Sequence, residues 1–332
     1  MTMKRILMIN TGGTFSSRPG PSGLAPELTG GEIAAQLGGG ISSVKLEVED
    51  YCSLDSANIR PEDWSRLALR IGEIIAAYDG VVIIHGTDTM AYTASMLSFM
   101  LQNPPIPIVL TGSQLPLGAP MSDAADNCLC AIEMASSGYS GVFVAFNRKI
   151  MLGCRTSKVR TVSFNAFESI NYPNVGEFNA FGLQLNLRRD NPSPLFRVQE
   201  AYSDRIAVLK LFPGMDPDIF RFLQEHGYEG VYIEGFGLGG VPFLKGDFTA
   251  EIRRASDAGM PILVGSQCRY EGSNLRVYET GQRILECGGI PVHNMTQEAV
   301  VTKLMWCLGQ TKRREDILRF FQQNLVQEVS FS

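Results

Sequence analysis

Three short turns rich in glycine and hydroxyl groups each directly follow an apolar run that is typical of a β-strand. The turns are Thr11–Thr14, His85–Thr89 and Thr111–Gln114, and the runs before them cover residues 5–10, 80–84 and 106–110. In an open parallel sheet the carboxyl ends of the strands share one edge, and ligands bind in the crevice there. We therefore expect the three turns to converge, although they lie far apart in the sequence.

Helical patterns alternate with these strands. Residues 64–78 carry apolar side chains at helical spacing, after a proline and two acidic residues that favour a helix start. Similar patterns cover residues 90–101 and 122–135, where Ser122 or Asp123 is suited to cap the helix. A further strand is expected at residues 141–146. This alternation predicts an α/β fold with a mainly parallel sheet covered by helices on both faces.

The alternation is interrupted by a polar, proline-containing stretch and then resumes. We interpret residues 188–204 as a linker, because strand-like and helical runs start again at residue 206 and end with two helices after residue 296. The 332 residues are enough for two domains. We predict a larger N-terminal catalytic domain, 1–187, with a mainly parallel sheet flanked by helices. A smaller C-terminal α/β domain, 205–332, is predicted to contain a parallel sheet.

Charge and cysteine content exclude several classes of protein. The net charge of −5 argues against a nucleic-acid partner, and the chain has no apolar run of membrane-spanning length. The N-terminus lacks the features of a signal peptide. The seven cysteines, odd in number and mostly within apolar runs, predict reduced buried thiols and a cytoplasmic protein. Cys128 and Cys130 have no further ligands nearby in sequence, so no metal site is predicted.

A hydrolase of this composition is not expected to use a Ser-His-Asp triad. The chain has three histidines and no G-x-S-x-G motif, and His85, at the end of a buried strand, is predicted to be a hydrogen-bonded core residue. Without histidine, a hydroxyl can be activated by a lysine that burial keeps neutral and a carboxylate orients. Asp88, which lies between two threonines, and Lys158 are the candidates for these two roles.

Thr14 is the candidate nucleophile. It follows two glycines whose backbone N–H groups are bare enough to approach a substrate oxygen. The stretch of residues 15–31 that comes next reads as a loop, and its composition leaves open whether it is an active-site lid or a plain connector. Each of the three turns alone has an ordinary structural interpretation, as a turn or a cap. Their joint occurrence at successive strand ends favours a catalytic site for a small polar substrate that contains a carbonyl group.

On these residues the chain resembles the bacterial-type L-asparaginases, specifically the cytoplasmic type I branch. The motifs that carry the resemblance extend over nearly the whole chain and are residues 9–14, 55–58, 82–94, 110–114, 155–158, 267–268 and 278–281. The resemblance implies hydrolysis of the side-chain amide of L-asparagine to L-aspartate and ammonia through an acyl-enzyme. It also implies a minor glutaminase activity and no need for a metal or a cofactor.

The resemblance implies a role for particular residues. Thr14 matches the nucleophile, and Thr87, Asp88 and Lys158 match a second catalytic triad. The residues expected to bind substrate are Asp55, Ser56, Thr87, Asp88 and Ser113. Among these, Ser56 matches the serine that holds the α-carboxylate, Asp88 would also meet the α-ammonium group, and the backbone around Ser113 matches the oxyanion or amide contact.

Two positions depart from the family pattern. Leu24 stands where a lid tyrosine commonly hydrogen-bonds the nucleophile, and Tyr270 or Tyr278 is a conceivable substitute from a neighbouring chain. Ala57 stands where secreted relatives carry a glutamine that contacts the α-carboxylate. One hydrogen bond to a charged group contributes about 1.5–3 kcal/mol, so weaker substrate binding is expected. The family also implies a homodimer or homotetramer with active sites near a subunit interface.

Two other functions are weighed against hydrolysis of asparagine. The amidase subunit of an archaeal-type tRNA amidotransferase usually has a further domain before its T-G-G-T turn, whereas here that turn starts at residue 11. A non-catalytic or regulatory amino-acid-binding protein of the same fold would be expected to lose catalytic residues. Thr14, Thr87, Asp88 and Lys158 are all present, which favours hydrolysis.

Overall fold

The computed structural model describes residues 3–20, 23–38, 44–186 and 195–331, with side chains for all of these except residues 19–20 and 23–26. The chain forms two compact units, Met1–Glu200 (unit 1) and Ala201–Ser332 (unit 2). The boundary between them lies within the segment 188–204, of which residues 188–194 fall outside the described residues. In the described parts of the chain, no helix has the length and apolar character needed to cross a membrane.

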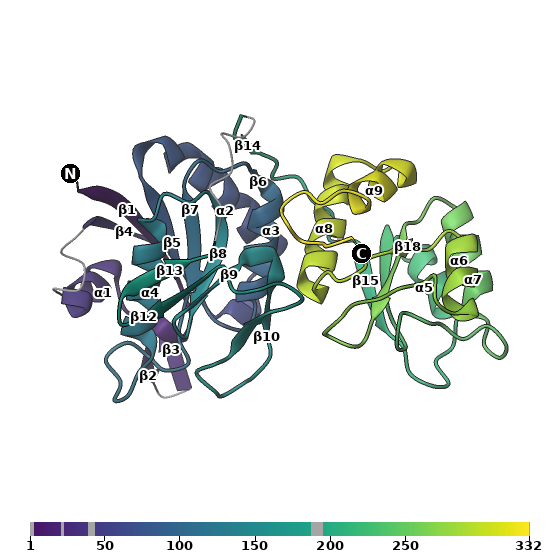
Figure 1. Cartoon of the computed structure of the whole chain (residues 1–332), viewed down its shortest axis with the longest axis horizontal. Coiled ribbons are helices and arrows are strands. Elements are labelled where there is room, and N and C mark those ends of the chain that lie inside the picture. Colours follow the sequence, from purple (N-terminus) through teal and green to yellow (C-terminus); the bar gives the residue numbers. More distant parts are fainter. Residues whose placement is uncertain (1–2, 21–22, 39–43, 187–194, 332) are drawn as a thin grey trace. The chain divides into compact units, whose positions relative to one another are not determined.

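Unit 1 is built on an eight-stranded sheet (Figure 1). In spatial order its strands are β13 (Gly182–Leu185), β12 (Gly176–Asn179), β9 (Lys149–Leu152), β8 (Gly141–Phe146), β7 (Pro107–Thr111), β5 (Gly80–Ile84), β1 (Lys4–Gly12) and β4 (Val44–Leu54). The strands from β8 to β4 are parallel to one another, and β9, β12 and β13 pair antiparallel. The mainly parallel N-terminal sheet predicted from the sequence is therefore confirmed.

Helices cover the central strands on both faces. Every residue of β5 and β7 is buried, and because successive side chains point to opposite faces, both faces must be covered. The covering helices include α3 (Met90–Met100) and α4 (Ala124–Ala135), which both pack on β7 and β8. Helix α2 (Pro61–Ile74) packs on α3 and begins with the proline and the two acidic residues that predicted its start.

The strand ends that carry the three turns lie side by side. Asn10 of β1 pairs with Ile84 of β5, and Ile84 pairs with Thr111 of β7. These three residues form one row across the sheet, so the chain leaves all three strands at the same edge. The predicted convergence of the turns is confirmed, and its cause is the parallel register of the strands.

The segment after the first turn differs from the expected loop. It contains a two-stranded antiparallel hairpin, β2 (Ser17–Gly20) and β3 (Gly23–Pro26), followed by helix α1 (Gly30–Leu37). Helix α1 starts with a capping box in which Thr29 and Glu32 bond each other's backbone N–H groups. The glycines, prolines and serines of this segment favoured a loop, but antiparallel pairing of so short a hairpin leaves no periodic apolar pattern in the sequence.

Unit 2 contains a smaller, fully parallel sheet. Its four strands, in spatial order, are β15 (Ile206–Lys210), β16 (Gly230–Gly235), β17 (Ile262–Ser266) and β18 (Ile290–Pro291). Its helices are α5 (Ile219–Glu225), α6 (Phe248–Asp257), α7 (Glu279–Glu286), α8 (Gln297–Gln310) and α9 (Arg314–Phe321). The side chain of Thr296 caps α8 as the sequence predicted, by accepting a hydrogen bond from the N–H of Ala299 at 3.0 Å. The predicted C-terminal α/β domain with a parallel sheet is confirmed.

The remaining elements among the described residues of unit 1 are short. They are the strand pairs β10 (Thr156–Lys158) with β11 (Phe167–Ser169) and β6 (Leu101–Gln102) with β14 (Arg197–Val198), and the 3₁₀ turns Thr14–Ser16, Ser56–Asn58, Ile75–Ala77 and Gly153–Arg155. Two of these 3₁₀ turns and the strand β10 carry residues predicted to act in catalysis or substrate binding.

Candidate active site

Glycine backbone brings the strand-end turns of unit 1 into direct contact. A Cβ atom on Gly13 would lie 2.4 Å from the Cα atom of Gly86, and a Cβ atom on Gly86 would lie 2.6 Å from the Oγ atom of Ser56. Any side chain at these two positions would therefore force the turns apart. Because Gly13 precedes Thr14 and Gly86 precedes Thr87, the two threonines lie on touching turns, with Ser56 beside the second.

Thr14 is half-buried and opens the 3₁₀ turn Thr14–Ser16. The residue before it, Gly13, has a φ of +77°, which places the backbone in a region that favours glycine. The expectation that the N–H groups of the two glycines face a substrate oxygen is wrong. The N–H of Gly12 donates to Oδ1 of Asn10 at 3.2 Å, and that of Gly13 donates to the carbonyl of Leu54 at 2.9 Å.

Lys158 joins Thr87 and Asp88. Its Nζ atom donates to Oγ1 of Thr87 at 2.8 Å and lies 2.6 Å from Oδ1 of Asp88. Thr87 is buried and the Lys158 side chain is 17% exposed, whereas the Asp88 side chain is 64% exposed. The Nζ atom of Lys158 is therefore enclosed beside the Thr87 hydroxyl, whereas the carboxylate of Asp88 is accessible to a charged group of a ligand. Pairing of β10 with β11 fixes the backbone that carries the lysine.

Asp55 and Ser56 form the wall next to this cluster. The carboxylate of Asp55 accepts the N–H of Ala57 at 2.9 Å and so caps the 3₁₀ turn that begins at Ser56. The Oγ atom of the buried Ser56 accepts the N–H of Asp88 at 3.2 Å. The structure thus places Ser56 against the turn that carries Thr87 and Asp88. The bond that Asp55 accepts from Ala57 fixes the turn that carries Ser56. Contact of either Asp55 or Ser56 with substrate stays a prediction.

The turn that carries Ser113 is held by two side chains that the sequence analysis did not assign to the site. The carboxylate of Asp123 accepts the N–H groups of Gln114 and Leu115, each at 3.1 Å. The amide of the buried Asn127 donates to the carbonyl of Gly112 at 2.9 Å. Of the two candidate caps for the following helix, Ser122 accepts the N–H of Ala124, and the Asp123 carboxylate makes no cap bond.

Not every hydroxyl at the strand ends faces the site. The hydroxyl of Thr11 donates to the carbonyl of Ile84 at 2.7 Å, and that of Thr111 donates to the carbonyl of Ala145 at 2.8 Å. Both residues are buried and tie neighbouring strands together. The hydroxyl of Ser113 donates to the carbonyl of Leu115, which leaves the backbone of its turn as the part suited to a substrate contact.

The hairpin β2–β3 begins three residues after Thr14. The hydroxyl of Ser17 donates to the carbonyl of Gly13 at 2.8 Å, and the side chain of Arg18 forms an ion pair with Glu32 at 2.6 Å. The base of the hairpin is thereby anchored to the turn that carries Thr14 and to α1. Leu24 lies in β3, and its side chain falls outside the described residues, so the effect of the missing lid tyrosine stays a prediction.

His85 is confirmed as a core residue. It is fully buried, its Nδ1 atom lies 2.7 Å from the carbonyl of Gly86, and its Nε2 atom lies 2.9 Å from Oγ1 of Thr93. Since a carbonyl can only accept, Nδ1 carries the hydrogen. The Thr93 hydroxyl accepts from Nε1 of Trp64 at 2.8 Å and so donates to Nε2 of His85. Burial lowers the pKa of His85 to about 4 and keeps the ring neutral.

The buried neutral histidine makes stability depend on pH. Because the pKa of His85 is lowered from 6.5 to about 4, the unfolded chain binds a proton that the folded protein excludes between these values. The stabilisation is present above pH 6.5 and is lost as the pH falls toward 4, by about 3 kcal/mol in total. Urea unfolding of the wild type and of His85→Gln, at pH 7.5 and pH 4.5, measures the loss. Similar losses in both proteins would contradict this account, and substitution of the exposed His226 is the control.

The seven cysteines are free thiols. Five are buried, Cys52 is partly buried and Cys268 is exposed. Burial raises the pKa of Cys52 to about 11, so this thiol, which donates to the carbonyl of Thr11, is protonated at neutral pH. Among the residues that the structure describes, no group of three or more histidine, cysteine, aspartate or glutamate side chains is placed to hold a metal ion.

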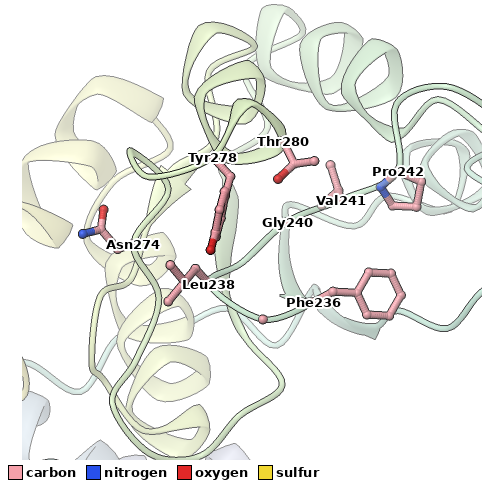
Figure 2. Close-up of a pocket in the computed structure, with 10 residues that line it drawn as sticks. Phe236, Leu238, Gly240, Val241, Pro242, Asn274, Tyr278 and Thr280 are labelled. Carbon is pink, nitrogen blue, oxygen red and sulfur yellow. The ribbon is translucent and has the colours of Figure 1, made fainter.

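A separate cavity of about 360 Å³ lies in unit 2, between the segment that follows β16 and the start of α7. Figure 2 shows its lining side chains, which include Phe236, Leu238 and Val241 with the polar groups of Asn274 and Tyr278. None of the candidate catalytic residues lines it. Tyr278 is 62% exposed and Tyr270 is 51% exposed, and the suggestion that either replaces the lid tyrosine stays a prediction.

Comparison with known proteins covers both units. A family model described as asparaginase, N-terminal, matches residues 5–191, and one described as glutaminase/asparaginase C-terminal domain matches residues 205–321. The chain is 40% identical to an L-asparaginase of Thermococcus kodakarensis, over 99% of this chain and 100% of that protein. It is 33% identical to a glutamyl-tRNA(Gln) amidotransferase subunit of Pyrococcus abyssi, over 99% of this chain and 77% of that protein.

A solved structure shows the same architecture. The crystal structure of L-asparaginase I from Vibrio cholerae matches with a TM-score of 0.91 and 30% sequence identity. The match covers 99% of this chain and 100% of that chain.

Proposed function

The chain belongs to the asparaginase family, and from this premise we propose that it hydrolyses the side-chain amide of L-asparagine to L-aspartate and ammonia. Thr14 is the proposed nucleophile, and Thr87, Asp88 and Lys158 are the proposed second triad. No metal or cofactor has a part in the proposed reaction. A minor activity on L-glutamine is part of the same proposal.

The contacts of Lys158 are the main support for this proposal. The Nζ atom of Lys158 lies within hydrogen-bond distance of both the Thr87 hydroxyl, at 2.8 Å, and the Asp88 carboxylate, at 2.6 Å. An isolated surface lysine would not be enclosed between a buried hydroxyl and a carboxylate. A hydroxyl, a base and a group that orients the base within hydrogen-bond reach are the usual signature of an activated nucleophile or an activated water.

The proposed reaction has two steps. In the first, Oγ of Thr14 bonds to the amide carbon of asparagine, the carbon–nitrogen bond breaks, and the hydroxyl proton leaves with the nitrogen as ammonia. In the second, water attacks the resulting ester, one proton returns to Oγ of Thr14, and L-aspartate is released. In its neutral form Lys158 accepts the hydroxyl proton by way of Thr87 and later returns it, and Asp88 holds the ammonium group that forms in between.

Substrate binding is proposed to use the groups around the touching turns. Ser56, held by its bond to the N–H of Asp88, is the proposed contact of the α-carboxylate, and the exposed carboxylate of Asp88 is the proposed contact of the α-ammonium group. The backbone of the Ser113 turn is the proposed contact of the amide oxygen. Asp55 is proposed to assist by fixing Ser56.

Two further properties are part of the proposal. A homodimer or homotetramer is expected for a member of this family. A cytoplasmic location is supported by the seven free cysteines, since such thiols persist in reducing compartments.

The direct test is ammonia release by the purified protein from L-asparagine, with L-glutamine and D-asparagine in parallel. We expect the fastest release from L-asparagine and a slower one from L-glutamine, because one methylene changes the binding energy by about 1–3 kcal/mol. Release only in the presence of a partner enzyme and its tRNA would favour the role of an amidotransferase subunit, to which the chain is also similar. Binding without release would identify an amino-acid-binding protein.

A further inference from the structure

The side chain of Asn10 makes four hydrogen bonds at the end of β1. Its Oδ1 atom accepts from the N–H of Gly12 at 3.2 Å and from the hydroxyl of Ser16 at 2.9 Å. Its Nδ2 atom donates to the carbonyl of Leu28 at 3.1 Å and to Oδ1 of Asp50 at 3.0 Å. An amide side chain has two acceptor positions and two donor hydrogens, and the buried Asn10 uses all of them.

The two accepted bonds hold the nucleophile turn on both sides of Thr14. Gly12 lies two residues before Thr14 and Ser16 lies two residues after it. The register between β1 and β4 shifts between Asn10 and Gly12, so the regular ladder is interrupted where the turn starts. An asparagine side chain that binds the N–H two residues further on is a common way to fix such a backbone.

The two bonds that Asn10 donates hold the chain that follows the hairpin β2–β3, one of them directly and the other through Asp50 of β4. The carbonyl of Leu28 is one acceptor, and the N–H of Leu28 donates to the carbonyl of Ser16 at 2.8 Å. Asp50 is the other acceptor, and its Oδ1 atom also receives the N–H of Gly30, at 2.8 Å, where α1 begins. The chain that enters the hairpin and the chain that leaves it are thus bonded to one side chain.

We propose that Asn10 is the positioning residue for the nucleophile: it locks the Gly12–Ser16 turn to the base of the hairpin, and so sets where the Thr14 hydroxyl stands. The first role, which we call positioning, is to set where the Thr14 hydroxyl stands, and it rests on the proposed function. The second, which we call anchoring, is to hold the Gly12–Ser16 turn on the base of the hairpin, and it does not depend on that function. Neither aspartate nor leucine replaces it. Aspartate retains both acceptors but faces the carboxylate of Asp50 without a donor, and leucine makes none of the four bonds.

The test compares Asn10→Asp and Asn10→Leu with the wild type by two measurements. Hydrogen–deuterium exchange of the folded protein is expected to become at least about tenfold faster in residues 12–17 and 27–31, and to stay unchanged in β7 and β8. Steady-state kinetics with L-asparagine are expected to show kcat lower by about 100-fold and KM within a factor of about three, since a misplaced reacting group affects chemistry more than binding.

Two further variants separate positioning from general stability. Ile6 is a fully buried residue of the same strand, and Ile6→Val is expected to lower the melting temperature without changing kcat or local exchange. Ser16→Ala removes one of the four bonds of Asn10, so its effects on exchange and on kcat are expected to have the same direction and to be smaller. This variant keeps the test decisive if Asn10→Leu does not fold.

Each outcome decides a part of the inference. Unchanged exchange in residues 12–17 and 27–31 overturns the anchoring role, whatever the activity. Faster exchange with an unchanged kcat overturns the positioning role and leaves Asn10 as a structural residue. If the wild type released no ammonia from any amide, the proposed function and the positioning role would fall together, and the exchange data would still support or overturn the anchoring role.

Discussion

Replacement of Thr14 by alanine is expected to lower kcat for L-asparagine by at least about 10⁴-fold, since loss of a nucleophile removes the covalent pathway and leaves only binding and electrostatic effects. Thr14 is half-buried on a turn that already has its own hydrogen bonds through Asn10 and Leu54. The protein is therefore expected to remain folded. KM, or the Kd for L-asparagine measured by calorimetry, is expected to change little.

Thr14→Ser and Thr302→Val are the matched controls for this experiment. Serine keeps a hydroxyl group at the same position and is expected to retain part of the activity. Thr302 is a fully buried threonine of α8 whose hydroxyl bonds only helix backbone among the described residues, so its loss tests the effect of removing a buried hydroxyl elsewhere. If Thr14→Ala kept more than a few per cent of the wild-type kcat, Thr14 would not be the nucleophile.

Replacement of Lys158 by methionine is expected to lower kcat by about 10³-fold, within the range by which a positioned acid or base accelerates a reaction. Methionine fills similar space but donates no hydrogen bond to Thr87 or Asp88, which Lys158 contacts at 2.8 and 2.6 Å. The largest effect is expected on kcat, measured by stopped-flow or steady-state ammonia release. A change in KM alone would instead make the lysine a substrate contact.

Lys158→Arg separates proton transfer from charge. Arginine keeps a positive charge beside Asp88 but does not give up a proton at accessible pH, so it is expected not to restore kcat if the lysine acts as a base. Recovery of most of the activity would mean that the positive charge alone matters. Lys4→Met is the matched control, because Lys4 pairs with Asp79 at 2.9 Å at the other end of β1 and is not expected to influence turnover.

Much of the fold could be predicted from local patterns. Strands at residues 80–84 and 141–146 and the start of α2 at Pro61 were found where the apolar runs and the helix-start signals placed them. Elements without such signals were missed. Strands β2 and β3 cover four residues each, are rich in glycine and proline and pair with each other, and helix α7 covers eight residues and starts without a side-chain cap.

The residue types in the sequence also limited which catalytic groups could act in amide hydrolysis. It contains few histidines, so the residue types left for amide hydrolysis were hydroxyls, a carboxylate and a lysine, all next to strand ends. It placed His85 in the core because that residue ends a fully apolar strand, and the structure agrees. What local patterns do not give is the partner of each group. A residue such as Asp123 fits a helix cap by its position, yet its carboxylate holds the Ser113 turn.

The sequence by itself determined the strand–turn–helix order of residues 80–135, the shared edge at which three turns meet, and the family to which the chain belongs. These follow from periodicity and from short motifs, which act over a few residues. The resemblance grouped Lys158 with Asp88, 70 residues away, but only the tertiary structure supplied the contact between them and showed that Asn10 bonds both the turn of Thr14 and the hairpin base. Such contacts depend on strand register and on the close approach of glycine backbones, and neither is encoded by any single stretch of the chain.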